Sequence, residues 1–77
     1  MNISWEYCVV SLQYYKGWRP RYFDGKKIKD WESGPFIHEY LEQMGAFGWE
    51  LASATSGKGL YGQSDSYQFY FKRSKKE

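Results

Sequence analysis

Apolar residues recur every three or four positions between residues 35 and 45, a spacing that gathers them on one face of a helix. These positions are Phe36, Ile37, Tyr40, Leu41 and Met44, while the polar residues His38, Glu39, Glu42 and Gln43 fall on the opposite face. Pro35 suits the first helical position, and Ser33 can accept hydrogen bonds from the first-turn amides. Gly45 suits a left-handed end to the last turn, and Gly48 offers a second such position. The pattern therefore predicts a helix over residues 35–45.

A two-residue period predicts three main strands, at residues 3–14, 49–55 and 66–73. The middle of the first strand is apolar on both faces, with Trp5, Tyr7 and Val9 on one face and Cys8, Val10, Leu12 and Tyr14 on the other. The last strand carries Tyr67, Phe69 and Phe71 on a single face. A strand with two apolar faces belongs to a sheet that is covered on both sides. One helix can cover only one of them.

Glycine and proline separate these segments. Residues 16–32 are expected to form a loop with a possible hairpin, because Asp24–Gly25 is a dipeptide that a type I′ turn favours. Residues 56–65 form a glycine-rich loop, longer than a tight hairpin needs, and residues 74–77 form a solvated tail. A chain of 77 residues has too little volume for two cores, so we expect a single domain over residues 1–77.

These elements predict an α+β fold of β-α-β-β order. We expect a three-stranded antiparallel sheet with one helix on one face, and a small β-ribbon or loop excursion before the helix. The expected core contains the helix face together with Trp5, Tyr7, Val9, Trp49, Leu51, Tyr67, Phe69 and Phe71. The face without a helix would then carry Cys8, Val10, Leu12, Ala52, Ala54 and Tyr70. An uncovered apolar face usually marks a partner surface, and we expect these residues to bind a second copy, by sheet packing or by pairing of free edges.

Composition bears on how so short a chain is stabilised. The single cysteine, Cys8, excludes a disulfide within the chain, and we expect it to be reduced. Aromatic residues make up 22% of the sequence, which favours dense aromatic packing together with self-association. The net charge of +2 does not by itself indicate a polyanionic partner. No segment resembles a signal peptide or approaches the roughly 20 apolar residues of a membrane span, so we expect a cytoplasmic protein with no membrane partner.

Three motifs carry a family resemblance. They are Trp5-Glu6-Tyr7-x-Val9-Val10 near the start, Gly45-x-x-Gly48-Trp49-Glu50-Leu51 between helix and strand, and the final Phe71-Lys72-Arg73. Together they resemble the small bacterial and phage proteins of domain-of-unknown-function family 4177. The segment from Trp18 to Pro35 resembles a longer-looped branch of that family. The resemblance implies the β-α-β-β fold and brings no activity and no catalytic residues with it.

Residue types that carry enzyme chemistry are few. The only histidine, His38, lies beside Glu39 and Glu42, but acid–base catalysis would also need a nucleophile or a substrate site. Cys8 has no basic neighbour in sequence that would lower its pKa, so we interpret it as a small buried hydrophobe. One cysteine and one histidine supply too few ligands for a structural metal. We therefore expect no enzymatic activity, no metal and no cofactor.

One segment interleaves bases and aromatics, as single-strand nucleic-acid binders do. The candidate ligand-binding residues are Trp18, Arg19, Arg21, Tyr22, Lys26, Lys27 and Lys58. The alternative is that Trp18 and Tyr22 pack the loop onto the sheet while the charges stay solvated. Lys58 belongs to a glycine-rich run, Gly57 to Gly62, that lacks the lysine-serine ending of the phosphate-binding loop but could still meet an anion.

Two function classes follow from these features. The first is a small non-enzymatic, self-associating binding or regulatory module, a dimer or higher homo-oligomer, based on the apolar second face of the sheet. The second is a binder of nucleic acid or of a small anionic ligand such as a nucleotide, which would use the basic-aromatic segment and Lys58.

Overall fold

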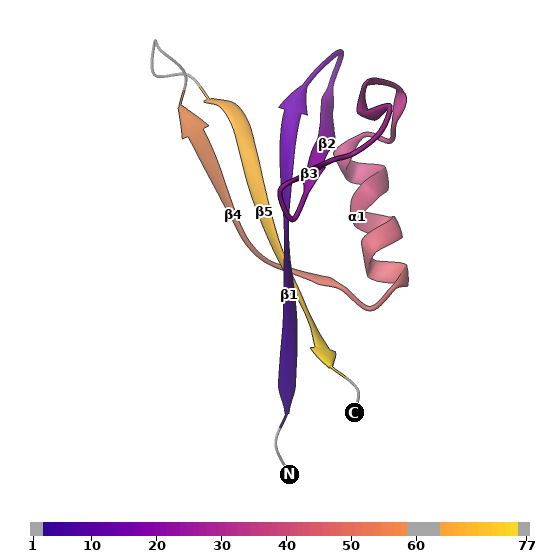
Figure 1. The fold of residues 1–77 in the computed structure, drawn as a ribbon, viewed down its shortest axis with the longest axis vertical. Helices are drawn as coiled ribbons and strands as arrows, with labels where there is room; N and C mark the ends of the chain where they lie inside the picture. The colour runs from indigo at the N-terminus through magenta and orange to yellow at the C-terminus, as the bar shows by residue number, and fades with distance from the viewer. Residues whose placement is uncertain (1–2, 59–63, 76–77) are drawn as a thin grey trace.

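The computed structural model of the protein describes residues 3–58 and 64–75 (Figure 1). The strands are β1 (Ser4–Tyr14), β2 (Trp18–Phe23), β3 (Lys26–Lys27), β4 (Glu50–Lys58) and β5 (Ser64–Lys75). A short 3-10 turn, η1 (Trp31–Ser33), precedes the helix α1 (Ile37–Ala46). The predicted helix and the three main strands are all present, and β4 and β5 both extend beyond their predicted ends.

All five strands belong to one antiparallel sheet of order β3-β2-β1-β5-β4. The expected three-stranded sheet is therefore wrong in its count, because the segment before the helix joins the same sheet. Asp24 and Gly25 both have positive φ, at 49° and 83°, as the predicted turn requires. The tip of this hairpin is bonded to β1, since Asp24 N donates to Val9 O and Val9 N donates to Asp24 Oδ1, each at 2.8 Å.

The register between β1 and β5 decides which face of the sheet is the core. Cys8 pairs with Phe71, Val10 with Phe69 and Leu12 with Tyr67, so these six residues share one face. The expectation that Trp5, Tyr7 and Val9 would pack under the helix is wrong. A shift of one residue in register exchanges the two faces of a strand, and both faces of β1 are apolar enough to fill a core. Trp5 and Tyr7 are 45% and 65% exposed on the face away from the helix.

The core lies between α1 and the face of the sheet that carries Val10. Its buried members are Cys8, Val10, Leu12, Met44 and Phe71, and Trp18, Phe23, Ile37, Tyr40, Leu41, Trp49, Tyr67 and Phe69 pack around them. The helix thus uses the apolar stripe that its sequence predicts. Val10 and Phe71 are the most completely buried side chains, and they come from adjacent strands in the middle of the sheet.

Both ends of α1 differ from their predicted form. The N-cap is Phe36, whose backbone N–H donates to Glu39 Oε1 at 3.0 Å, so Pro35 lies before the helix and Ser33 does not cap it. Instead, the Ser33 hydroxyl donates to the Asp30 carbonyl at 3.1 Å within η1. Gly45 lies inside the helix, and the left-handed position after it is Gly48, with φ of 87°. The chain leaves the helix there and enters β4.

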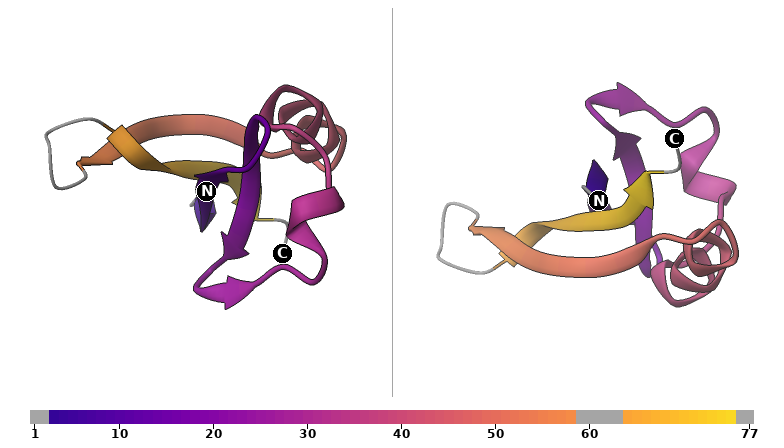
Figure 2. Two further views of the ribbon diagram at one scale, coloured as in Figure 1. Left: turned by 90° about the horizontal axis from the view of Figure 1, so that it is seen from above. Right: turned by 90° about the horizontal axis from the view of Figure 1, so that it is seen from below.

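The hairpin of β4 and β5 extends away from the helix. Figure 2 shows the two strands projecting to one side of the sheet, with α1 packed at the opposite end. Its far portion is consequently not covered by a helix on either face. No helix in the described ranges is long and apolar enough to cross a membrane.

Candidate functional site

β4 is a long strand at the margin of the sheet, and in the described part of the chain no other strand pairs with its outer edge. It has nine residues, and β5 is its only partner among the described residues (Figure 1). All of its residues from Glu50 to Ser56 are exposed. A bulge places the extra residue Ala52 between Leu51 and Ser53, and the register is regular from Ser53 to Gly57. No charged residue and no proline occurs between Leu51 and Gly57, so apart from the bulge at Ala52 and the register shift between Gly57 and Lys58 this stretch lacks the features with which proteins commonly block edge pairing.

The opposite edge of the sheet does carry such features. β3 is only two residues long, and both are exposed lysines, Lys26 and Lys27. The outer side of β2 contacts η1 and α1, and its buried Pro20 has no backbone N–H to donate. At the start of β1, where Ser4 to Cys8 pair with β5 alone, Glu6 places a charge on the helix side of the strand. By these criteria, β4 is the edge best suited to receive another strand.

An apolar groove lies beside β4 on the helix side of the sheet. It has a volume of about 330 Å³ and is lined by Leu12, Trp18, Ile37, Ala54, Tyr67 and Phe69. Of the described residues that line it, Ala54 is the one that comes from β4, and it pairs with Phe69 of β5. The groove therefore lies between the start of the helix and the β4–β5 hairpin, and Ala54 brings it next to the edge strand.

The two arginines of the basic-aromatic segment make contacts within the fold. The Arg19 guanidinium lies 4.1 Å from the Phe36 ring centroid, and it donates to the carbonyls of Tyr15 at 2.8 Å and Gly34 at 2.5 Å. The Arg21 guanidinium lies 5.1 Å from the Trp31 ring centroid and 5.2 Å from that of Tyr22. These arginines hold the loop and η1 against β2, which the sequence alone did not indicate.

The other candidate ligand-binding residues are not gathered at one place. Trp18 packs against the core, with its ring centroid 4.6 Å from that of Tyr67 in an edge-on arrangement. Tyr22 is half-buried in β2, and Lys26 and Lys27 extend from the β3 edge. The side chain of Lys58 and the residues 59–63 lie outside the described part of the structure. Trp18 thus packs on the core, as in the alternative interpretation, whereas the role of Tyr22 as a ligand-binding residue stays a prediction.

The predicted self-association residues fall on different surfaces. Cys8, Val10 and Leu12 are buried under α1. Their assignment to the uncovered face is wrong, because their register with β5 places them on the helix side of the sheet. Ala52 is the bulge residue of the β4 edge, and Ala54 lies beside it on the groove side. The remaining residue, Tyr70, pairs with Val9 and Ser53 on the face away from the helix.

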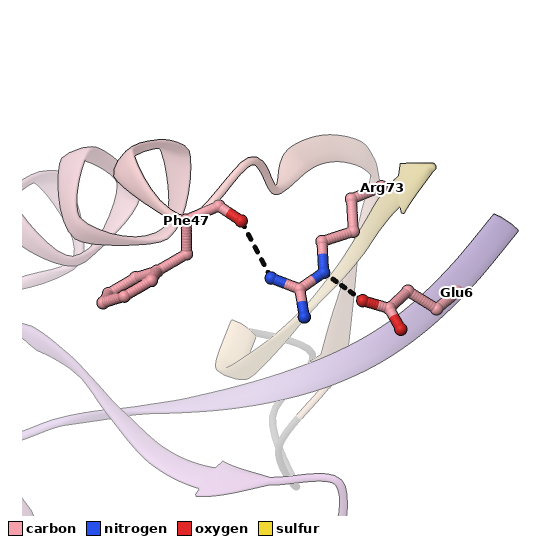
Figure 3. Close-up of polar contacts among 3 residues, drawn as sticks. All are labelled: Glu6, Phe47 and Arg73. Carbon is pink, nitrogen blue, oxygen red and sulfur yellow. Dashed lines mark hydrogen bonds and ion pairs between the residues drawn. The ribbon is translucent and has the colours of Figure 1, made fainter. Parts of the chain in front are cut away.

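A guanidinium, a carboxylate and the end of the helix meet near the start of β1 (Figure 3). Arg73 lies opposite Glu6 in the sheet and its Nε donates to Glu6 Oε1. Its Nη1 donates to the Phe47 carbonyl at 2.8 Å, and the Trp49 ring centroid lies 4.2 Å from the guanidinium carbon. Arg73 therefore ties the end of α1 to two strands. An open cleft of about 550 Å³ lies here, lined by Glu6, Phe47, Gly48, Arg73, Ser74 and Lys75.

A second cluster lies on the opposite face of the sheet. It consists of Trp5, Glu50 and Lys72, each adjacent in sequence to a residue of the first cluster. Lys72 Nζ lies 4.8 Å from the Trp5 ring centroid and 3.5 Å from Glu50 Oε1. The Glu50 side chain is 65% exposed, so this ion pair is screened and contributes little to stability. Each of the dipeptides Trp5–Glu6, Trp49–Glu50 and Lys72–Arg73 thus places one residue in each cluster.

The comparisons with known proteins identify the family of this chain. The family model described as a domain of unknown function, DUF4177, matches residues 5–74. The chain belongs to this family. Neither the search of curated proteins nor the search of solved structures found a match. The description of the DUF4177 family names no activity.

Three other titratable side chains of this DUF4177 chain are either buried in the fold or packed against a neighbouring ring. Burial raises the pKa of the Cys8 thiol to about 11, and the nearby Asp24 carboxylate adds to the increase. Burial also raises the pKa of the Tyr40 hydroxyl. His38 is exposed and its ring stacks on Phe36 with centroids 5.9 Å apart. Among the described residues, no group of three His, Cys, Asp or Glu is placed to hold a metal ion.

Proposed function

We propose that this DUF4177 protein is a non-enzymatic, self-associating binding module in which a second copy pairs with the free edge of β4. The observation that supports the proposal most directly is the difference between the two edges of the sheet. The β3 edge is short and carries two lysines, whereas β4 offers nine residues with no charge from Leu51 to Gly57. Unpaired N–H and C=O groups on such an edge favour pairing with another strand.

Symmetry suggests how two copies would pair. The regular part of β4, Ser53 to Gly57, has Thr55 at its middle. An antiparallel pair of β4 strands with a two-fold axis at Thr55 places each Thr55 opposite its counterpart and joins two sheets into one. One strand from each copy makes a small interface, which would bury less than about 1,200 Å² of total surface, the range of weak and transient complexes. We therefore expect a dimer that dissociates on dilution.

The contacts of Arg19 and Arg21 favour this proposal over anion binding. Both guanidinium groups lie against aromatic rings of the fold, and two nitrogens of Arg19 donate to backbone carbonyls. A phosphate would have to compete with these contacts. A salt-dependent affinity for a labelled oligonucleotide that is lost in the double variant Arg19→Glu, Arg21→Glu would instead support the anion-binding alternative.

Two matched lysine substitutions test the proposal. Thr55 lies on the edge strand, and Gln68 pairs with it on β5, one strand further into the same exposed face. Thr55→Lys places two like charges opposite each other in the paired edges, a repulsion of about 1–4 kcal/mol at 4 Å. Native mass spectrometry should find this variant monomeric and the Gln68→Lys control as dimeric as the original protein. A mixture of Thr55→Lys and Thr55→Glu should recover the dimer as a heterodimer.

Other results would either move the interface away from the β4 edge or exclude a dimer. Loss of the dimer in both variants would place the interface on the exposed face of the sheet rather than on the β4 edge. A monomer at every concentration of the original protein would overturn the proposal. Circular dichroism of both variants checks that they are folded, which is expected because both positions are exposed.

A further inference from the structure

The apolar groove and the free edge share the residue Ala54. The groove lies on the helix side of the sheet, and Ala54 is both one of its lining residues and a member of the edge strand. The side chain of Ala54 is small, so it covers little of the Phe69 ring, which pairs with it on β5 and also lines the groove. A side chain that approaches along the edge can therefore reach the groove across Ala54.

A strand added to β4 would place every second side chain on this face. In a pair of β4 strands centred on Thr55, the residue opposite Ala54 is Ser56 of the second copy. Serine is too small to fill a groove of about 330 Å³, whose lining is apolar. The second copy thus satisfies the edge but leaves the groove empty. The volume is at the small end of the 300–1,000 Å³ or so of ligand pockets, which suits one large side chain.

We propose that β4 and the groove together bind an extended segment of another protein, one that carries a large apolar side chain opposite Ala54. This inference rests on the proposed function in that it uses the same edge. The segment would form the main-chain hydrogen bonds that the second copy forms, and in addition it would bury an aromatic or branched aliphatic side chain. Main-chain pairing supplies affinity and the side-chain pocket supplies specificity in this mode of recognition. Such a segment would displace the second copy.

Peptides derived from β4 itself provide the probe. Three capped peptides cover residues 50–58: one unsubstituted, one with Ser56→Phe and one with Thr55→Phe. Position 56 of a paired peptide lies opposite Ala54 on the groove side, whereas position 55 projects to the other face. We expect the Ser56→Phe peptide to bind about tenfold more tightly than the unsubstituted one, and the Thr55→Phe peptide to show no such gain.

Amide NMR titration of the labelled protein measures these affinities and locates the contacts. The Ser56→Phe peptide should shift the signals of Ala54, Tyr67 and Phe69 and the indole signal of Trp18. Equal affinities for the three peptides would overturn the inference, and so would a gain for Thr55→Phe equal to that for Ser56→Phe. The protein variant Ala54→Leu narrows the groove at an exposed position, and on this variant the Ser56→Phe peptide should bind no more tightly than the unsubstituted peptide.

The two proposals fail separately. A monomeric protein that still prefers the Ser56→Phe peptide would overturn self-association and retain the peptide site. A dimer that binds all three peptides equally, or that binds none of them, would retain self-association and overturn the peptide site.

Discussion

Val9 and Val10 are adjacent in β1 and test which face of the sheet is the core. Val10 is fully buried next to Phe71 and Met44, and Val9 is half-buried on the face away from the helix. Truncation of Val10 to alanine removes two buried carbons, worth about 1.6 kcal/mol of transfer free energy at about 0.8 kcal/mol each. The cavity left behind raises the expected loss to roughly 2–3 kcal/mol. Val9→Ala is expected to lower the free energy of unfolding by less than about 1 kcal/mol.

Urea unfolding followed by circular dichroism measures both variants. The protein concentration should be low enough for the monomer to predominate, because dimerisation adds to the apparent stability. A core of this size supplies only about 3–5 kcal/mol, so Val10→Ala should lose about half of the stability. With a slope of about 1–2 kcal/mol/M, its midpoint should fall by 1 M or more. The reasoning is refuted if Val9→Ala is destabilised as much as Val10→Ala.

Further predictions concern the substitution or modification of individual residues. The Cys8 thiol, whose pKa is raised to about 11 from 9.0, should resist alkylation at pH 8 in the folded protein. The thiol ionises at a lower pH in the unfolded chain than in the folded protein. The free energy of unfolding should therefore fall by up to about 3 kcal/mol as the pH rises from 9 to 11, and it should fall less in Cys8→Ala. Arg73→Lys should lower the melting temperature, with a loss of about 1–2 kcal/mol, because lysine cannot contact both Glu6 and the Phe47 carbonyl; an unchanged melting temperature would contradict this role. Gly45→Ala should stabilise the helix by about 0.5–1 kcal/mol, whereas Gly48→Ala, at positive φ, should destabilise the protein in the same thermal assay.

The sequence predicted the elements better than their faces. Periodicity located the helix and the three main strands, and Asp24–Gly25 located the hairpin, because these signals depend only on neighbouring residues. The core face of β1 depends on its register with β5, a long-range property. Both sets of alternate residues in β1 are apolar, so alternation alone could not decide between them. Because Val10 pairs with Phe69 of β5, Val10 lies on the same face of the sheet as the aromatic residues of the core.

The candidate site was predictable only in part. The sequence suggested free sheet edges as a route to self-association, and in the structure β4 is the edge strand with an uncharged stretch, from Leu51 to Gly57. Arg19 and Arg21 looked available for a ligand because their partners, Phe36 and Trp31, are more distant in sequence and meet them only when the loop folds onto β2. The pairing of Glu6 with Arg73 joins the two ends of the chain, and the only signal for it was their presence in the family motifs.

Hydrogen exchange of the β4 amides at two protein concentrations tests edge pairing most directly. Pairing with a second copy would bury the outward-facing amides between Ser53 and Gly57 in new hydrogen bonds, while those of β3 would stay exposed. We predict that protection in this stretch increases with protein concentration and does not increase in the Thr55→Lys variant. Exchange in β4 that is independent of concentration, while the protein is dimeric, would contradict the account and place the interface elsewhere.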